Sequence, residues 1–382
     1  MNLDKFDSRS VPSPCFVVDE VAVERNLKII DRVQNESGAK VLLALKGFAM
    51  WSLFPLLQRY LSGCCASGLN EVLLAKDEFR GEIHVHSPAF PNGDLEQLIR
   101  LADHISFNSF DQWERVKDQL AGTDIRVGIR INPEHSEVET SIYDPCGPGS
   151  RLGVTAEAFE KHAGELDGIT GLHFHTLCEL NADSLQRTLA VVEEKFGVYL
   201  ADSRITWVNF GGGHHISRDD YDVNLLIELL VAFRKKYDVD VILEPGEAIA
   251  LNTGVLVATV LDVAHNGVDN AILDISATAH MPDVLEMPYR PNVFGASEGS
   301  SHSYRLGGLS CLAGDVIGDY SFEKPLEVGD RLVFDDMAHY TMVKTTMFNG
   351  VSLPTIAIHN SETGESRVVR RFGYEDYRSR LS

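Results

Sequence analysis

A lysine stands at the end of the first apolar run of the sequence. Residues 41–45 read as a buried strand, and Lys46 follows them directly. Burial of an ammonium is costly, so burial lowers the pKa of a lysine and makes its amine a nucleophile that can form a Schiff base. The ordinary alternative is a charged side chain that reaches water just beyond the strand end. Lys46 is therefore a candidate nucleophile whose role depends on its neighbours.

Two later apolar runs also end in residues that could do chemistry. The run 207–210 precedes Gly211, Gly212 and Gly213, and such a loop lets backbone N–H groups close around a phosphate. The run 239–243 precedes Glu244, whose carboxylate can accept a hydrogen bond from a protonated pyridine nitrogen. A flexible turn and a helix cap are the ordinary alternatives.

A pair of histidines occupies another strand end. His173 and His175 lie on one face of the run 171–175, because side chains alternate along a strand. The spacing also suits metal ligands. We expect His175, which is nearer the strand end, to be functional and His173 to be packed in the core.

Three further candidates stand outside these runs. Arg151, in a Gly-Ser-Arg-Leu-Gly segment, can orient a phosphate or an acidic loop. Cys311 lies among small residues and can act as an acid or a nucleophile if its pKa is tuned. Tyr340 can donate a hydrogen bond to an anion. Taken singly, these residues are more often a surface arginine, a buried structural cysteine and a packed aromatic ring.

Short β-branched runs alternate with helical patterns through the first two thirds of the chain. The eight runs are 41–45, 64–66, 83–86, 104–107, 125–131, 171–175, 207–210 and 239–243, and the clearest helical patterns are 53–60, 70–77 and 225–231. Strands that alternate with helices pair in parallel, and eight units predict a closed (β/α)8 barrel with its site at the carboxyl ends of the strands. A doubly wound open sheet is the alternative, but no G-x-G-x-x-G turn supports it.

After about residue 252 the sequence pattern changes from alternating strands and helices to strands with few helices between them. The runs 255–261, 271–275, 331–334 and 354–358 predict a mostly β domain, which the early strand 15–18 also joins. We therefore expect residues 1–20 to belong to the β domain, residues 21–255 to form the barrel, and residues 256–382 to form the β domain that contributes Cys311 and Tyr340.

Charge and composition exclude several classes of protein. The 34 basic and 56 acidic residues give a formal charge of −22, whereas a nucleic-acid binder needs a basic face. No stretch approaches the ~20 apolar residues of a membrane helix, and the first residues show no signal peptide. The six cysteines form no regular framework, so we expect reduced thiols in a cytoplasmic protein.

In this order, the motifs resemble those of the fold-type III pyridoxal-phosphate decarboxylases, the group of ornithine and diaminopimelate decarboxylases. The resemblance runs from residue 12 to about residue 350. Its pieces are the lysine strand, Ser-Arg-Leu-Gly at 150–153, Phe-His at 174–175, Gly-Gly-Gly at 211–213, Glu-Pro-Gly at 244–246, Cys311 with Asp315, Tyr-Thr at 340–341 and Phe-Asn-Gly at 348–350. Each piece is weak alone, but the ordered set is specific.

Within this group the chain most resembles the carboxynorspermidine/carboxyspermidine decarboxylases. The closer match lies in the segments 44–48, 173–179, 244–248, 281–290 and 311–315. Glu247 stands where the better-known relatives usually have an arginine, and Glu286, near Asp283, stands about where diaminopimelate decarboxylases place one. This exchange of charge suits a cationic substrate tail and disfavours a dicarboxylate.

The resemblance implies pyridoxal 5′-phosphate as the cofactor, with Lys46 holding it as a Schiff base. Glu244 would keep the ring nitrogen protonated, and His175 would stack on the ring. The implied phosphate ligands are Gly211, Gly212, Gly213 and Tyr340, with Arg151 in support.

The implied reaction is decarboxylation of carboxynorspermidine, carboxyspermidine or both, in polyamine biosynthesis. Cys311 would protonate the resulting carbanion from the second subunit of a homodimer with shared active sites. The cationic tail of the carboxy-triamine would meet Glu247, Asp283 and Asp315.

Several alternatives stay open. A diaminopimelate or other basic amino-acid decarboxylase has the same fold, and an inactive relative would act as a binding regulator. A metal-dependent hydrolase would instead use His173, His175 and either His214 or His215. The family's alanine racemase cousins set an arginine against the pyridine nitrogen, which Glu244 contradicts. One methylene separates carboxynorspermidine from carboxyspermidine and contributes only ~1–3 kcal/mol in a pocket, so the sequence does not rank them.

Overall fold

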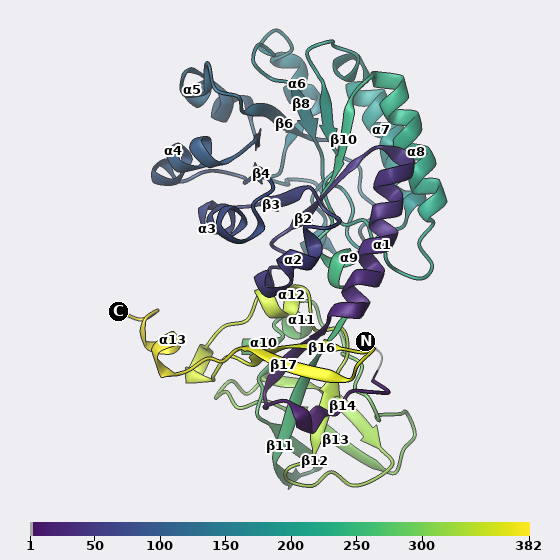
Figure 1. Cartoon of the computed structure of the whole chain (residues 1–382), viewed down its shortest axis with the longest axis vertical. Helices are drawn as coiled ribbons and strands as arrows, with labels where there is room; N and C mark the ends of the chain where they lie inside the picture. The colour runs from purple at the N-terminus through teal and green to yellow at the C-terminus, as the bar shows by residue number, and fades with distance from the viewer. Residues whose placement is uncertain (1–2) are drawn as a thin grey trace. The chain divides into compact units, whose positions relative to one another are not determined.

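The structure is a computed structural model that describes residues 3–382. The chain divides into two compact units (Figure 1). One unit is Asn26–Ile249, and the other joins Met1–Arg25 to Ala250–Ser382. The chain passes from one unit to the other within helices α1 (Glu20–Ser37) and α9 (Glu247–Ala250). The first unit is therefore inserted between two segments of the second.

The inserted unit contains a closed barrel of eight parallel strands. They are β2 (Lys40–Ala44), β3 (Gly63–Ala66), β4 (Glu82–His86), β5 (His104–Phe107), β6 (Arg126–Asn132), β8 (Gly171–His173), β9 (Trp207–Asn209) and β10 (Asp240–Leu243). Pairing of β10 with β2 and of β5 with β6 closes the ring. A short strand, β7 (Val154–Thr155), pairs with β6. All eight runs of the sequence are barrel strands, so the predicted barrel is confirmed.

The helices of this unit alternate with the strands. They are α2 (Phe54–Leu57), α3 (Leu69–Leu74), α4 (Asn92–Leu101), α5 (Phe110–Leu120), α6 (Ala156–Lys161), α7 (Ala182–Leu200) and α8 (Val223–Tyr237). The long helices α7 and α8 run side by side (Figure 1). Helix α8 begins where Asp222 accepts a hydrogen bond from the N–H of Leu225 at 2.9 Å and ends at Asp238, which has a left-handed backbone.

Two predicted helices are shorter than expected. The pattern at 53–60 gives only α2, preceded by a 3₁₀ turn at Trp51–Leu53. The pattern at 70–77 gives α3 and then a π-helical turn at Ala75–Phe79. The N–H of Arg80 donates to the carbonyl of Ala75 at 2.8 Å, which widens the last turn. Periodicity alone does not reveal this change of hydrogen-bond register.

A tryptophan fills the interior of the barrel. Trp207 is fully buried with Leu42 and Ile242. The glycines on two neighbouring strands make room for its ring, since a Cβ at Gly171 would lie 2.0 Å from it and a Cβ at Gly128 would lie 2.5 Å from it. These two positions require glycine because the indole occupies the space of a side chain.

The second unit is built on one mixed eight-stranded sheet. Its strands are β1 (Cys15–Asp19), β11 (Gly254–Asn266), β12 (Val268–Leu273), β13 (His302–Gly307), β14 (Val316–Phe322), β15 (Arg331–Phe334), β16 (Thr355–Asn360) and β17 (Glu365–Arg370). Strand β1 pairs antiparallel with β11 and parallel with β16, so residues 15–19 lie inside this sheet.

Short helices fill the connections of this unit. They are α10 (Ala277–His280), α11 (Asp283–Glu286), α12 (Tyr340–Val343) and α13 (Tyr374–Arg378). Strands β13, β14 and β17 are additional to the four runs expected here. Strand β13 buries only Tyr304 and Leu306, and β17 is half-buried at best, so neither carries a strong apolar signal. No helix in the described range 3–382 is long and apolar enough to cross a membrane.

Candidate active site

The loops after the carboxyl ends of the barrel strands, called the barrel mouth below, hold the lysine. Lys46 follows β2, and its side chain is exposed. The N–H of Leu45 donates to the carbonyl of Cys65 at 3.1 Å, and the N–H of Ala44 donates to that of Pro245 at 3.1 Å. Within residues 3–382, Lys46 Nζ has no hydrogen-bond or ion-pair partner. The amine is therefore held near the Glu-Pro-Gly turn and is accessible to a ligand.

The predicted carboxylate is buried and fixed. Glu244 is 8% exposed, and its Oε1 accepts a hydrogen bond from Asn209 Nδ2 at 2.6 Å. Asn209 Oδ1 in turn accepts from the N–H of Gly211 at 2.8 Å. The imidazole of His173 approaches the other carboxylate oxygen at 4.0 Å. One asparagine thus orients both Glu244 and the start of the glycine loop, a role that the sequence did not indicate.

His175 is held by the same loop. Its Nδ1 accepts a hydrogen bond from the N–H of Gly212 at 2.9 Å, which leaves Nε2 to carry the proton of the neutral ring. Burial lowers the pKa of His175 well below its usual range, and the positive charges of Lys46 and Arg130 lower it further. The ring is therefore neutral and fixed in orientation, as stacking on a flat ligand requires.

Close packing sets the shape of the glycine loop. Gly211 and Gly213 have φ of +69° and +82°, and a Cβ at Gly213 would lie 1.9 Å from the carbonyl oxygen of Leu177. The N–H groups of Gly211 and Gly212 already donate to side chains within the loop. Two of the predicted phosphate donors are thus engaged, and phosphate binding by this loop stays a prediction.

A buried arginine is the main feature that the sequence reading missed. Arg130 lies on β6, and its Nη1 donates to His86 Nε2 at 2.9 Å, while His86 Nδ1 donates to the carbonyl of Ser106 at 2.9 Å. Burial lowers the pKa of Arg130 to about 10, and the Glu244 carboxylate opposes this shift. The guanidinium stays charged at pH 7. A charged residue inside the apolar run 125–131 was the available signal.

Two more residues of the mouth interact electrostatically with the lysine. Burial raises the pKa of Glu71, whereas a hydrogen bond from the N–H of Ser67 at 2.6 Å and the charge of Lys46 lower it. Burial and then the Glu244 carboxylate raise the pKa of the Cys65 thiol well above its usual range. Cys65 is therefore a neutral thiol beside Glu244 and no nucleophile.

Arg151 is placed through its backbone. Its carbonyl accepts a hydrogen bond from Asn108 Nδ2 at 2.8 Å, and the N–H of Gly153 donates to Asn108 Oδ1 at 2.7 Å. The side chain of Arg151 is exposed. Its predicted support of a phosphate stays a prediction.

The other predicted residues lie in the sheet unit. Cys311 is exposed on a loop whose N–H at this position donates to Asn349 Oδ1 at 2.9 Å. Tyr340 is half-buried at the start of α12. Asp315 is 4% exposed, and its carboxylate accepts from the N–H groups of Ser310 at 3.0 Å and of Thr278 at 3.3 Å. Asp315 therefore holds the Cys311 loop, and its predicted contact with substrate has no support in these bonds.

Asp283 already has a cationic partner. Lys344 Nζ lies 2.5 Å from Asp283 Oδ1 and 2.5 Å from Glu286 Oε2. Burial opposes the charge of Lys344, but the two hydrogen bonds outweigh burial and raise its pKa. One lysine thus compensates part of the acidic charge that the sequence reading assigned to the substrate tail.

Two groups of side chains in the range 3–382 have metal-ligand spacing, and neither contains His173 or His175. In the first, the rings of His84 and His104 stack 3.8 Å apart and Glu82 is paired with Lys40 at 2.6 Å. The in-plane lone pairs of stacked rings run parallel, so they do not converge on one ion. The second group lies at the barrel mouth and consists of Glu179, His215 and Glu247.

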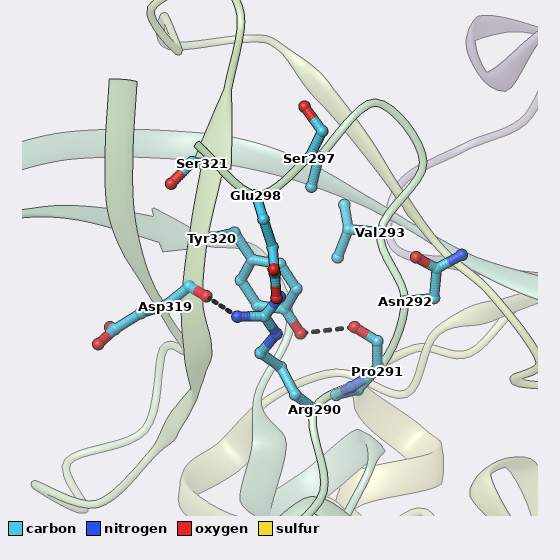
Figure 2. A pocket seen from close by; sticks show the side chains of 10 residues that line it. Arg290, Pro291, Asn292, Val293, Ser297, Glu298, Asp319, Tyr320 and Ser321 are labelled. Carbon is cyan, nitrogen blue, oxygen red and sulfur yellow. Dashed lines mark hydrogen bonds between the residues drawn. The ribbon is translucent and has the colours of Figure 1, made fainter. Parts of the chain in front are cut away.

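The sheet unit has a pocket of about 290 Å³ (Figure 2). Arg290 lies over the ring of Tyr320, 4.8 Å from its centroid, and donates to the carbonyl of Asp319 at 2.8 Å. The Tyr320 hydroxyl donates to the carbonyl of Pro291 at 2.7 Å. These polar groups satisfy one another, and none of the predicted site residues lines the pocket.

Comparison with known proteins decides the family. Residues 15–338 match the family model described as "Pyridoxal-dependent decarboxylase, C-terminal sheet domain" of the ornithine, diaminopimelate and arginine decarboxylases. The chain belongs to this family. It is an enzyme family whose cofactor is pyridoxal phosphate, so the resemblance found in the sequence is confirmed.

Relatives of this pyridoxal-dependent decarboxylase span nearly its whole length. It is 49% identical to carboxyaminopropylagmatine decarboxylase of Synechocystis sp., over 97% of this chain and 96% of the relative. It is 43% identical to carboxynorspermidine/carboxyspermidine decarboxylase of Campylobacter jejuni, over 96% and 98%. The crystal structure of the C. jejuni carboxynorspermidine decarboxylase with norspermidine superposes with a TM-score of 0.89 at 42% identity, over 97% of this chain and 100% of that one.

The barrel mouth fits the family's cofactor. An amine without a partner, a buried carboxylate and a neutral, fixed imidazole are the groups that an aldehyde, a pyridinium nitrogen and a flat ring require. In this decarboxylase Lys46, Glu244 and His175 supply them from three different strand ends. Both nitrogens of the buried His173, beside Glu244, lack a hydrogen-bond partner among the described residues, which leaves polar atoms for a ligand or water to satisfy.

Proposed function

We propose that this pyridoxal-dependent decarboxylase removes CO2 from carboxynorspermidine, carboxyspermidine or both, and so makes a polyamine. The relationship to the C. jejuni enzyme carries this proposal: the chains are 42% identical over nearly their whole length, and that structure holds norspermidine. Diaminopimelate decarboxylases have the same fold at 17–19% identity, which supports the fold alone.

A second candidate substrate is carboxyaminopropylagmatine, because the relative with 49% identity is named for it. Its head is the same α-amino acid as in the carboxy-triamines. The difference lies at the far end, where a guanidinium replaces an ammonium. Both classes require a site that recognises a long cationic tail.

The charges at the barrel mouth favour such a tail. Glu247 replaces a usual arginine, and its side chain is 17% exposed, so its carboxylate is partly shielded from water. Asp283 is already paired with Lys344, so part of its negative charge is compensated within the fold. The distal carboxylate of diaminopimelate would be repelled here.

Pyridoxal phosphate, when bound, supplies the electron sink for the bond that breaks. Lys46 Nζ would hold the cofactor, Glu244 would accept a hydrogen bond from its ring nitrogen, and His175 would present the flat face of its ring. Gly213, Tyr340 and Arg151 would bind the phosphate. Arg130, held by His86, keeps a positive charge near Glu244.

We infer that the thiol of Cys311 delivers the proton to the carbon that has lost CO2. Its exposure on a loop of the sheet unit is consistent with delivery to the barrel of a second subunit, as in a homodimer with shared sites. The six free cysteines are consistent with a reducing compartment, and we place the enzyme in the cytoplasm.

The test is CO2 release by the cofactor-loaded enzyme. The panel is carboxynorspermidine, carboxyspermidine, carboxyaminopropylagmatine, meso-diaminopimelate, ornithine and arginine, each offered alone. We expect release from the first three and a kcat/KM for diaminopimelate lower by at least about 100-fold, the effect of ~2.7 kcal/mol. Comparable turnover of diaminopimelate or ornithine would refute the polyamine function and leave the general decarboxylase.

A further inference from the structure

We propose that Asn349 is a positioning residue for Cys311. It fixes the backbone from which the thiol delivers its proton, and so directs that proton to the substrate carbon. The inference rests on the proposed role of Cys311 and deepens it. The Phe-Asn-Gly segment at 348–350 is one of the motifs of the resemblance, but the proposed function gives Asn349 no role.

The loop that carries Cys311 is exposed, yet its backbone is held at five successive positions. The N–H groups of residues 308–312 all donate hydrogen bonds. Their acceptors are, in chain order, the carbonyl of Asp315 at 2.9 Å, the carbonyl of Ile275 at 3.1 Å, the Asp315 carboxylate at 3.0 Å, the Asn349 amide oxygen at 2.9 Å and the Ser310 hydroxyl at 3.4 Å. An exposed loop usually leaves such groups to water, so this loop is fixed in one conformation.

Asn349 provides the bond to the cysteine itself. Its Oδ1 accepts from the N–H of Cys311, and the two residues lie 38 positions apart in the chain. Asp315 instead holds the base of the loop, because its carboxylate also accepts from the N–H of Thr278 in α10 at 3.3 Å. Water could satisfy an exposed N–H almost as well, so what the Asn349 bond adds is a defined position.

The segment that carries Asn349 is itself anchored. The N–H of Thr346 donates to the carbonyl of Ala279 in α10 at 2.7 Å, and the N–H of Gly350 donates to the carbonyl of Met347 at 3.1 Å. The side chain of Met347 is buried. Helix α10 therefore anchors both the Cys311 loop and the segment that holds it, so Asn349 joins two fixed parts of the sheet unit.

The backbone of Asn349 restricts the residue type at this position. Its φ of +60° lies in the left-handed region, which glycine, asparagine and aspartate adopt more readily than most residues. Glycine has no side chain to accept the bond. Aspartate would add a negative charge beside the loop, and a nearby negative charge makes a thiol a weaker acid. Asparagine combines the required backbone with a neutral acceptor.

The position of the thiol matters because the proton has two possible destinations. After CO2 leaves, the electron pair of the broken bond is shared between the substrate carbon and the cofactor. A proton on the substrate carbon gives the polyamine. A proton on the former aldehyde carbon of the cofactor, followed by addition of water, gives an aldehyde in place of the terminal amine and leaves the nitrogen on the cofactor as pyridoxamine 5′-phosphate. A donor must lie within hydrogen-bond reach of the atom that it protonates, so a loosely held thiol misdirects the proton more often.

The experiment compares three variants of the cofactor-loaded enzyme. Asn349→Gly keeps the left-handed backbone and removes the acceptor, whereas Asn349→Asp keeps both. Asp238→Gly is the matched control, because Asp238 is also exposed and left-handed, with φ of +54°. It lies at the end of α8 and before β10, at the opposite end of the strands from the barrel mouth.

The first readout is the ratio of pyridoxamine 5′-phosphate to norspermidine formed from carboxynorspermidine. We expect this ratio to rise about 3–10-fold in Asn349→Gly, the factor that one neutral hydrogen bond contributes. It should stay within about 3-fold of wild type in Asn349→Asp and in the control. The KM should change less than about 2-fold, because the bond acts after the substrate is bound. Loss of stability alone would not change the ratio.

The second readout does not depend on turnover. Hydrogen–deuterium exchange of a peptide that covers residues 308–315, followed by mass spectrometry, should be at least about 3-fold faster in Asn349→Gly. Exchange should match wild type in Asn349→Asp and in the control.

Three results would overturn the proposal. The first is a wild-type product ratio in Asn349→Gly. The second is a raised ratio without faster exchange, because Asn349 would then act other than through the loop. The third is equal misdirection by Asn349→Gly and Asn349→Asp.

Cys311→Ala distinguishes failure of this inference from failure of the proposed function. If Cys311→Ala keeps the wild-type product ratio, Cys311 is not the proton donor and the inference fails with that role. If Cys311→Ala misdirects the proton and Asn349→Gly does not, only the role of Asn349 fails.

Discussion

Replacement of Asn209 by alanine should weaken both the barrel mouth and the cofactor site. The variant loses the 2.6 Å hydrogen bond to Glu244 and the 2.8 Å bond from the N–H of Gly211. A bond to a charged group contributes about 1.5–3 kcal/mol and a neutral bond about 0.5–1.5 kcal/mol, so the free energy of unfolding should fall by about 2–4 kcal/mol. Asn209 is 2% exposed, so water replaces the lost partners poorly.

Cofactor affinity should fall together with stability. Without Asn209 the Glu244 carboxylate has freedom to turn away from the position where a ring nitrogen would meet it. If about half of the lost free energy is expressed on binding, the Kd for pyridoxal phosphate rises roughly tenfold, because ~1.4 kcal/mol is a factor of ten.

The assay combines urea unfolding of the apoenzyme with titration of pyridoxal phosphate by visible absorbance. The matched control is Asn270→Ala, which removes only a half-exposed 3.0 Å bond to the carbonyl of Val268. The control should change the unfolding free energy by no more than about 0.5 kcal/mol. If Asn209→Ala matches the control in both measurements, Glu244 is positioned by other groups and the reasoning fails.

Other variants test single features of the fold and site. Lys46→Ala should abolish the visible absorbance that borohydride removes, and an unchanged absorbance would rule out Lys46 as the cofactor amine. Cys311→Ala should keep the cofactor but slow or misdirect protonation, checked by turnover in deuterated water; normal turnover and product would exclude the role. Gly213→Ala, with its Cβ 1.9 Å from the carbonyl of Leu177, should lower the free energy of unfolding by at least about 1 kcal/mol, and a neutral effect would mean that the loop adapts. Glu82→Gln should lower the free energy of unfolding by about 1–2 kcal/mol at pH 7 after allowance for screening, because hydrogen bonds from His84 and Lys40 lower the pKa of Glu82 from 4.5 to about 2. The difference between wild type and variant should shrink as the pH falls below about 4.5. A difference that grows instead would contradict this prediction.

Much of the barrel was readable from local sequence. Each of its eight strands is a short run of β-branched or apolar residues between helical patterns, and parallel strands leave their carboxyl ends at one edge. The ordered motifs placed Lys46, His175 and Glu244 at those ends. Strands β13 and β17 escaped detection because few of their side chains are buried, so the apolar pattern on which such predictions depend is weak.

The hydrogen bonds and ion pairs within the site could not be predicted from local sequence. Asn209 and Glu244 lie 35 residues apart, and Asp283 lies 61 residues from Lys344. The sequence around each of these residues does not indicate its partner. The pairing with Lys344 changes the interpretation of Asp283, because the fold already compensates part of the negative charge that the sequence assigns to a substrate contact.

The sequence by itself determined the barrel, the order of the reactive residues and the family, because these depend on local periodicity and on motifs in chain order. Only the tertiary structure showed which groups are joined by hydrogen bonds and which interact through their charges. It showed Asn209 between Glu244 and the glycine loop, His86 holding Arg130, and Glu179 beside Glu247. The physical reason is that hydrogen bonds and charge interactions act through space over a few ångströms, whereas the sequence records only distance along the chain.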